Sequence, residues 1–170
     1  MNWEAIGAIG EILGATVVVV TIFYLARQTK QSVELNRVAE QRILIDQGNT
    51  YFRITIDPEN LAAIRKGFRS YRNLSRDEQA KVFIVFLQWL NHYEKCMYAH
   101  DAGMLPKPVM IAFKNFALSI LVTAGGKEFW EDMGPAVGQD LQDSINGALL
   151  SGQLPGPVTE TFHWLRDEDT

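Results

Sequence analysis

The sequence predicts an all-α protein, in which one N-terminal transmembrane helix continues into a stalk and is followed by a small cytoplasmic helical bundle. Most of the first 26 residues are apolar, whereas much of the remaining chain has the composition of a soluble helical protein. Helix start and stop signals then recur along the rest of the chain. We therefore expect a transmembrane anchor over 1–26, a juxtamembrane stalk over 27–48, a bundle over 49–150, and a linker with an acidic C-terminal segment over 151–170.

The anchor is predicted by the segment 6–26, which reads IGAIGEILGATVVVVTIFYLA and carries one charge. As a helix rising about 1.5 Å per residue it spans roughly 31 Å, the thickness of a hydrocarbon core. Its eleven Ile, Leu, Val and Phe residues each favour insertion by about 0.4 kcal/mol, whereas Glu11 opposes it by at most about 3 kcal/mol. Insertion is therefore expected.

The charges beside this segment predict its orientation. Arg27, Lys30 and Arg37 follow it, and no Lys or Arg precedes it in the sequence. The positive-inside rule then puts the N-terminus outside the bacterial inner membrane and the domain in the cytoplasm, with these basic side chains near anionic lipid. The start of the chain lacks a basic region and a small-residue cleavage site, so we expect a retained anchor and not a cleaved signal peptide.

Small residues form a stripe on one face of this predicted helix. At about 100° per residue, Gly7, Gly10, Gly14 and Thr21 fall on that stripe. Gly10 and Gly14 form a GxxxG step, which lets two helix backbones approach closely in lipid. Glu11 lies at the edge of the stripe. It is either an intramembrane ionisable site that faces a partner or a proton path, or a carboxyl group that reaches the outer headgroups.

Two helices are expected next. The stalk contains no Gly or Pro from Arg27 to about Gln47, and Gly48-Asn49 predicts a weakening or break. Asp57-Pro58-Glu59 combines a capping residue, a proline in the first turn and a favourable acidic residue. This pattern predicts a short helix that ends near Ser70.

The remaining helices follow from similar signals. Ser75 and Glu78 form a capping box that opens a long helix to about Asp101, with Gly103 as its stop. A second buried helix is expected over 109–122, ending at Gly125-Gly126 and followed by a short aromatic turn at 128–130. A weaker helix over 136–150 and a Gly/Pro linker then lead to a last segment that contains Trp164.

Several stretches resemble a known group of bacterial proteins. These are WEAIGAIGEILGA at the start, YLARQ after the valine-rich stretch, NLSRDEQ opening the helix that holds Glu94, then AHDAGML and GGKEFW. The chain resembles a family of bacterial single-pass membrane proteins of uncharacterised activity over most of residues 2–145. The resemblance implies the anchor and the helical domain, and it carries no catalytic residue.

One group of residues invites a chemical interpretation. His92, Cys96 and His100 recur at four-residue spacing, which suits metal ligands or a thiol next to a base. The two ends are about 12 Å apart along a helix, so three ligands cannot share one ion, and ordinary packing is the favoured interpretation. Phosphate-binding loops and HExxH, GxSxG or CxxC motifs are lacking. We expect no enzymatic activity, no cofactor and no metal.

Charge also bears on partners. Residues 27–81 hold 11 Lys/Arg against 7 Asp/Glu, whereas residues 82–170 hold 5 against 11. The acidic second half argues against nucleic acid, and the basic first half favours membrane lipid. The leading hypothesis is a non-enzymatic assembly protein, either a homo-oligomer or an accessory subunit of a larger membrane complex. The alternatives are an oligomeric ion or proton pathway lined by Glu11, and a membrane-tethered ligand-binding sensor.

Overall fold

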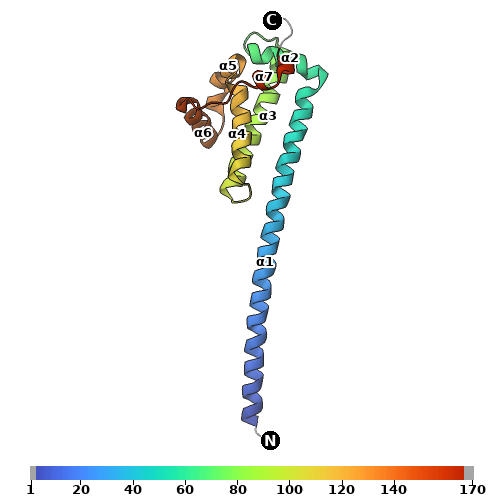
Figure 1. Ribbon diagram of the computed structural model, residues 1–170, viewed down its shortest axis with the longest axis vertical. Coiled ribbons are helices and arrows are strands. Elements are labelled where there is room, and N and C mark those ends of the chain that lie inside the picture. The colour runs from blue at the N-terminus through green and yellow to red at the C-terminus, as the bar shows by residue number, and fades with distance from the viewer. Residues whose placement is uncertain (1–2, 167–170) are drawn as a thin grey trace. The chain divides into compact units, whose positions relative to one another are not determined.

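The computed structural model describes the backbone of residues 3–166 and the side chains of residues 7, 10, 11 and 13–166. Within these residues every regular element is a helix (Figure 1), as the all-α prediction requires. Residues 167–170, the end of the predicted acidic segment, lie outside the described residues. The elements in order are α1 Trp3–Ile56, α2 Pro58–Arg69, α3 Arg76–Asp101, α4 Lys107–Leu121, α5 Ala124–Met133, η1 Gly134–Ala136, α6 Gln139–Ser151, α7 Val158–Thr161 and η2 His163–Leu165.

The chain divides into two compact units, Met1–Ala39 and Glu40–Thr170. Residues 40–48, which the sequence assigns to the stalk, therefore belong to the second unit. In the described part of the chain, no single helix is both long and apolar enough to cross a membrane. The pair Lys107–Leu121 and Ala124–Ala136 passes that test only together, with a bend of 101°, and it supplies buried core residues such as Leu118 and Phe129.

The break predicted at Gly48-Asn49 is wrong, because α1 continues to Ile56. A Cβ at Gly48 would lie 3.3 Å from His92 Nε2 and 3.4 Å from Phe113. The glycine therefore allows the last part of α1 to pack tightly on α3 and α4. Glycine costs a helix about 1 kcal/mol, and burial of neighbouring side chains such as Leu44 offsets that cost.

The start signals of α2 and α3 are confirmed. Asp57 Oδ1 accepts a hydrogen bond of 2.9 Å from the Glu59 amide, and Pro58 is the first residue of α2. At α3, the Ser75 hydroxyl accepts from the Glu78 amide, and the Glu78 carboxylate accepts from the Ser75 amide. The predicted stop at Gly103 is also confirmed, because this glycine has a φ of 71° just after the helix.

The role predicted for Gly125 and Gly126 is wrong. Helix α4 already ends at Leu121, and both glycines lie in the first turn of α5, which Thr123 caps through a 3.0 Å bond from the Gly126 amide. The expected aromatic turn is part of this helix. A Cβ at Gly125 would lie 1.7 Å from the Gly67 carbonyl oxygen, so this glycine allows the backbones of α5 and α2 to approach closely.

The bundle core lies around α3, which contacts α2 and α4. Figure 1 shows α3 and α4 side by side, with α5 and α6 following α4. The last segment packs on this core, because Val158 and Leu165 are buried. Arg65 Nε also donates a 2.8 Å hydrogen bond to the Trp164 carbonyl. The weaker helix predicted over 136–150 corresponds to α6.

Candidate functional site

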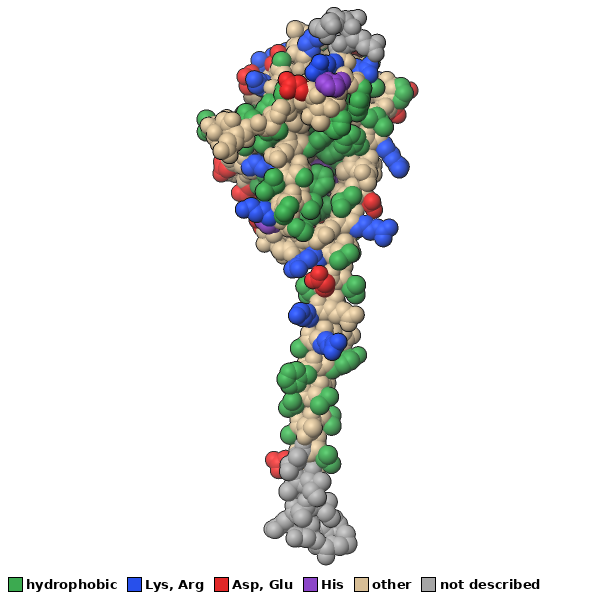
Figure 2. All heavy atoms as spheres, in the orientation of Figure 1, with side chains coloured by type: hydrophobic (Ala, Val, Ile, Leu, Met, Phe, Trp, Pro, Cys, Tyr) green, Lys and Arg blue, Asp and Glu red, His purple; other side chains and the backbone are tan. Residues whose placement is uncertain are grey.

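The first unit exposes an apolar helical segment. Figure 2 shows hydrophobic side chains along the visible side of this segment. Successive side chains on a helix are about 100° apart, so the four consecutive valines 17–20 point to every side. Nine large apolar side chains are each at least 52% exposed: Leu13, Val17, Val18, Val19, Val20, Ile22, Phe23, Tyr24 and Leu25.

The predicted packing stripe is uncovered within this unit. A Cβ at Gly7, Gly10 or Gly14 would meet no described atom within 4 Å. The Thr21 hydroxyl donates to the Val17 carbonyl at 2.8 Å, so its hydrogen-bonding capacity is used within the helix, as lipid would require. Glu11 is exposed beside these glycines.

The basic residues predicted to lie at the membrane surface come after this segment on the same helix. Arg27 and Lys30 are exposed, and Arg37 forms a 3.5 Å ion pair with Glu34. An exposed pair of this kind contributes little to stability. Arg27 and Lys30 remain accessible to an anionic surface.

The His92, Cys96 and His100 set does not converge on a ligand. Among the residues that the structure describes, no three His, Cys, Asp or Glu side chains could hold one metal ion. Burial raises the pKa of the Cys96 thiol to about 12, which removes the thiolate that nucleophilic chemistry needs. His100 Nδ1 lies 2.8 Å from the Leu105 carbonyl oxygen, where it can only donate.

His92 is fully buried among aromatic rings. Its imidazole lies almost perpendicular to the rings of Phe113 and Tyr51, with centroids 4.6 Å and 5.4 Å away. Neither ring nitrogen has a hydrogen-bond partner in the described structure. Burial, followed by the nearby positive charge of Lys95, lowers the pKa of His92 to about 4. This histidine is a neutral core residue.

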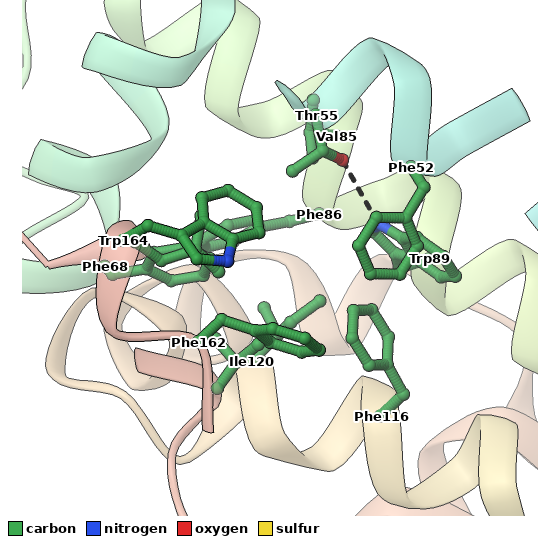
Figure 3. Close-up of a pocket in the computed structure, with 12 residues that line it drawn as sticks. Phe52, Thr55, Phe68, Val85, Phe86, Trp89, Phe116, Ile120, Phe162 and Trp164 are labelled. Atoms are coloured by element: carbon green, nitrogen blue, oxygen red, sulfur yellow. Dashed lines mark hydrogen bonds between the residues drawn. The ribbon is translucent and has the colours of Figure 1, made fainter. Parts of the chain in front are cut away.

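An aromatic cavity lies where the last segment meets the bundle (Figure 3). Phe162 and Trp164 line it from the C-terminal side, opposite Phe52 and Trp89. Trp89 Nε1 donates to the Thr55 hydroxyl at 3.5 Å. The cavity volume is about 10 Å³, near the lower limit for one water molecule. This cavity is therefore a packed core and offers no room for a larger ligand.

A second, open pocket lies between α3, α4 and α6 and has a volume of about 350 Å³. We call it the Lys114 pocket. Within it, Lys114 Nζ donates to Ser144 Oγ at 3.1 Å, and Ser144 Oγ lies 2.5 Å from the Tyr93 hydroxyl. Its lining comprises Tyr93, Met97, His100, Asp101, Lys107, Met110, Ile111, Lys114 and Ser144.

The polar groups of this pocket are held by rigid elements. Tyr93 lies on α3 and is almost completely buried. Its hydroxyl forms a hydrogen bond with Ser144. Burial raises the pKa of its hydroxyl, so the hydroxyl stays protonated at neutral pH. In the region covered by the structure, neither Lys107 nor Lys114 has a carboxylate within ion-pair distance.

Sequence reasoning did not find this pocket. Lys114 is one of few polar residues in the apolar stretch 109–122, and that exception was the available signal. Tyr93 and Ser144 gave none, since one looks like a core aromatic residue and the other like an ordinary helix residue. No known protein family, curated protein or solved structure matches the chain.

Proposed function

We propose that this protein is a non-enzymatic, membrane-anchored assembly protein, with residues 6–26 in the bacterial inner membrane and the bundle in the cytoplasm. The observation that carries the proposal is the apolar segment, whose large side chains are exposed on every side of a helix. Soluble proteins rarely leave a contiguous apolar surface of this size in water. Lipid is the environment that removes this cost.

The basic residues after the segment support the orientation. Arg27 and Lys30 are exposed, and each contributes roughly 1 kcal/mol when it lies near an anionic leaflet. The positive-inside rule puts this end of the segment in the cytoplasm and its other end outside. Membrane lipid is then the first partner of the protein.

The proposed assembly role rests on the glycines of the predicted packing stripe. Gly7, Gly10 and Gly14 have no side chains, and the space beside each of them is open. In lipid, helices associate through close packing at such faces, because the hydrophobic effect no longer drives them together. A second copy or the spanning helix of another membrane protein fits this surface, and Glu11 then lies next to the interface.

The anchor is tested by placing charges in the segment. The double substitution Val18→Asp and Val20→Asp costs about 6 kcal/mol of insertion free energy, which exceeds the roughly 4 kcal/mol that the apolar side chains supply. We expect wild-type protein in the membrane fraction after alkaline extraction and the variant outside it. Leu150→Asp is the matched control, since Leu150 is an 88% exposed apolar residue of α6. Recovery of intact wild-type protein without detergent would refute the anchor.

Association is tested with Gly10→Ile and Gly14→Ile together. We expect the mass of the detergent-solubilised protein to fall from an oligomer to a monomer, because the new side chains keep the backbones apart. Val20→Ile on the opposite face adds bulk and should leave the mass unchanged. An unchanged mass in the glycine variant would argue against association through this face.

Liposome flux separates assembly from the alternative of an ion or proton pathway. If several copies of Glu11 line such a pathway, the wild-type protein should conduct, and Glu11→Gln should reduce that conductance. The assembly proposal expects no flux above that of empty liposomes for either protein. Flux that depends on Glu11 would replace the assembly role with the pathway.

A further inference from the structure

Within the Lys114 pocket, the group formed by Lys114, Ser144 and Tyr93 has more hydrogen-bond donors than it uses internally. The Lys114 ammonium has three donors and no acceptor, and a single one of them is used, toward Ser144. The Ser144 and Tyr93 hydroxyls each have one hydrogen, and the hydrogen bond between them uses only one of the two, whichever hydroxyl donates. One hydroxyl hydrogen and two ammonium hydrogens thus have no acceptor among the described protein groups, and an acceptor-rich group placed there would satisfy them.

The charged residues of the pocket indicate the sign and the amount of charge that such a group carries. Lys107 and Lys114 contribute two positive charges and Asp101 one negative charge, which leaves a net charge of one positive. A carboxylate neutralises this charge. A phosphate monoester, with about −1.5 to −2 at neutral pH, exceeds it.

The remaining lining specifies the rest of the ligand. Met97, Met110 and Ile111 lie in the same pocket and offer an apolar wall beside the polar group. At roughly 30 Å³ for each heavy atom, as in liquid water, a volume of about 350 Å³ holds on the order of ten heavy atoms. Mostly apolar lining with a few converging polar groups is the usual composition of a small-molecule site.

We propose that the Lys114 pocket binds a small apolar monocarboxylate, with its carboxylate on Lys114, Ser144 and Tyr93 and its hydrocarbon part against Met97, Met110 and Ile111. Catalysis is not part of the proposal. Ser144 lies inside α6, where the backbone amides are engaged in the helix and cannot form an oxyanion hole. This site gives the ligand-binding hypothesis a location in the bundle, and it does not depend on the anchor or on oligomerisation.

The test measures binding of hexanoate to the full chain in nanodiscs of zwitterionic lipid, by calorimetry, with empty nanodiscs as the blank. Hexanamide has the same size and no charge, so we expect at least tenfold weaker binding of the amide. Lys114→Met removes the ammonium at similar length and should weaken hexanoate binding by about 10- to 100-fold. Ser144→Ala should weaken it by about fivefold.

The matched control is Lys127→Met, which removes an exposed lysine of α5 outside the pocket and should leave binding unchanged. Equal binding of hexanoate and hexanamide, or unchanged binding in Lys114→Met, would overturn the proposal. Absence of saturable binding at about 10 mM hexanoate would overturn it as well. Tighter binding of inorganic phosphate or hexyl phosphate would replace the carboxylate by a phosphate ligand. The comparison with hexanamide needs no variant, so it decides the question even if Lys114→Met does not fold.

Discussion

Acid should destabilise the bundle through His92, and the size of the effect follows from its burial. The ring has no hydrogen-bond partner in the described structure and its pKa falls from the ordinary 6.5 to about 4. Below pH 6.5 the unfolded chain takes up a proton at this residue, whereas the folded protein does so only near pH 4. Stability is therefore lost as the pH falls from 6.5 to 4, and the loss stays constant below that range.

The difference between these two pKa values sets the magnitude of the loss. Protonation of the buried ring costs the folded state about 3 kcal/mol in full, at about 1.4 kcal/mol for each pKa unit. Between about pH 7.5 and pH 5 the expected loss is about 2 kcal/mol. The Glu128 and Asp132 carboxyl groups, whose pKa values are lowered below 4.5 and 3.8 by hydrogen bonds from the residues 70–72, lose their contribution only at lower pH.

The assay is urea unfolding of the full chain in mild detergent, followed by tryptophan fluorescence at the two pH values. His92→Leu removes the titrating group and two unpartnered nitrogens, so we expect the pH effect to disappear. His163→Leu is the control, because His163 is exposed, and it should keep the wild-type effect. If His92→Leu still lost about 2 kcal/mol on acidification, the burial argument would be refuted.

Three further predictions concern packing, the loop after α2 and the cysteine. Gly125→Ala brings a Cβ to 1.7 Å from the Gly67 oxygen and should lower the free energy of unfolding by about 3 kcal/mol. Gly147→Ala, in open space on α6, should raise it by about 0.5–1 kcal/mol. Thermal unfolding of both variants measures the contrast. Glu128→Gln weakens hydrogen bonds from the amides of Tyr71 and Arg72 at 2.8 and 2.9 Å and should cost about 1–2 kcal/mol, and an unchanged urea midpoint would contradict this. Burial raises the pKa of the Cys96 thiol to about 12. At pH 8 this thiol should therefore react with iodoacetamide at least about 100-fold more slowly in the folded protein than in the unfolded protein. Equal rates would mean that the thiol is accessible.

The sequence by itself determined the features that depend on neighbours along the chain. The caps at Asp57 and at Ser75 with Glu78 are local, since each side chain bonds to an amide two or three residues away. The stop at Gly103 is equally local, because it depends on the φ of one residue. The proposed membrane anchor is also an inference from sequence, since it rests on the length and composition of one segment.

Glycines mark the point where this local reasoning fails. Gly48 and Gly125 are helix-breaking residues by propensity, and the sequence therefore predicted a break and an end. In the structure both lie within helices. A Cβ at Gly125 would clash with the backbone of Gly67, and a Cβ at Gly48 would lie in tight contact with His92 and Phe113. Whether a glycine ends a helix or allows close packing depends on what lies opposite, and only the tertiary structure supplies that neighbour.

The Lys114 pocket was decided by tertiary structure in the same way. Tyr93, Lys114 and Ser144 lie on three different helices, and each is unremarkable by itself. Packing of α3, α4 and α6 brings their polar atoms within hydrogen-bond distance and leaves donors that no described protein group accepts. A pattern along one chain records periodicity and local bonds, whereas a polar group such as Lys114, Ser144 and Tyr93 exists only after distant side chains have been brought together.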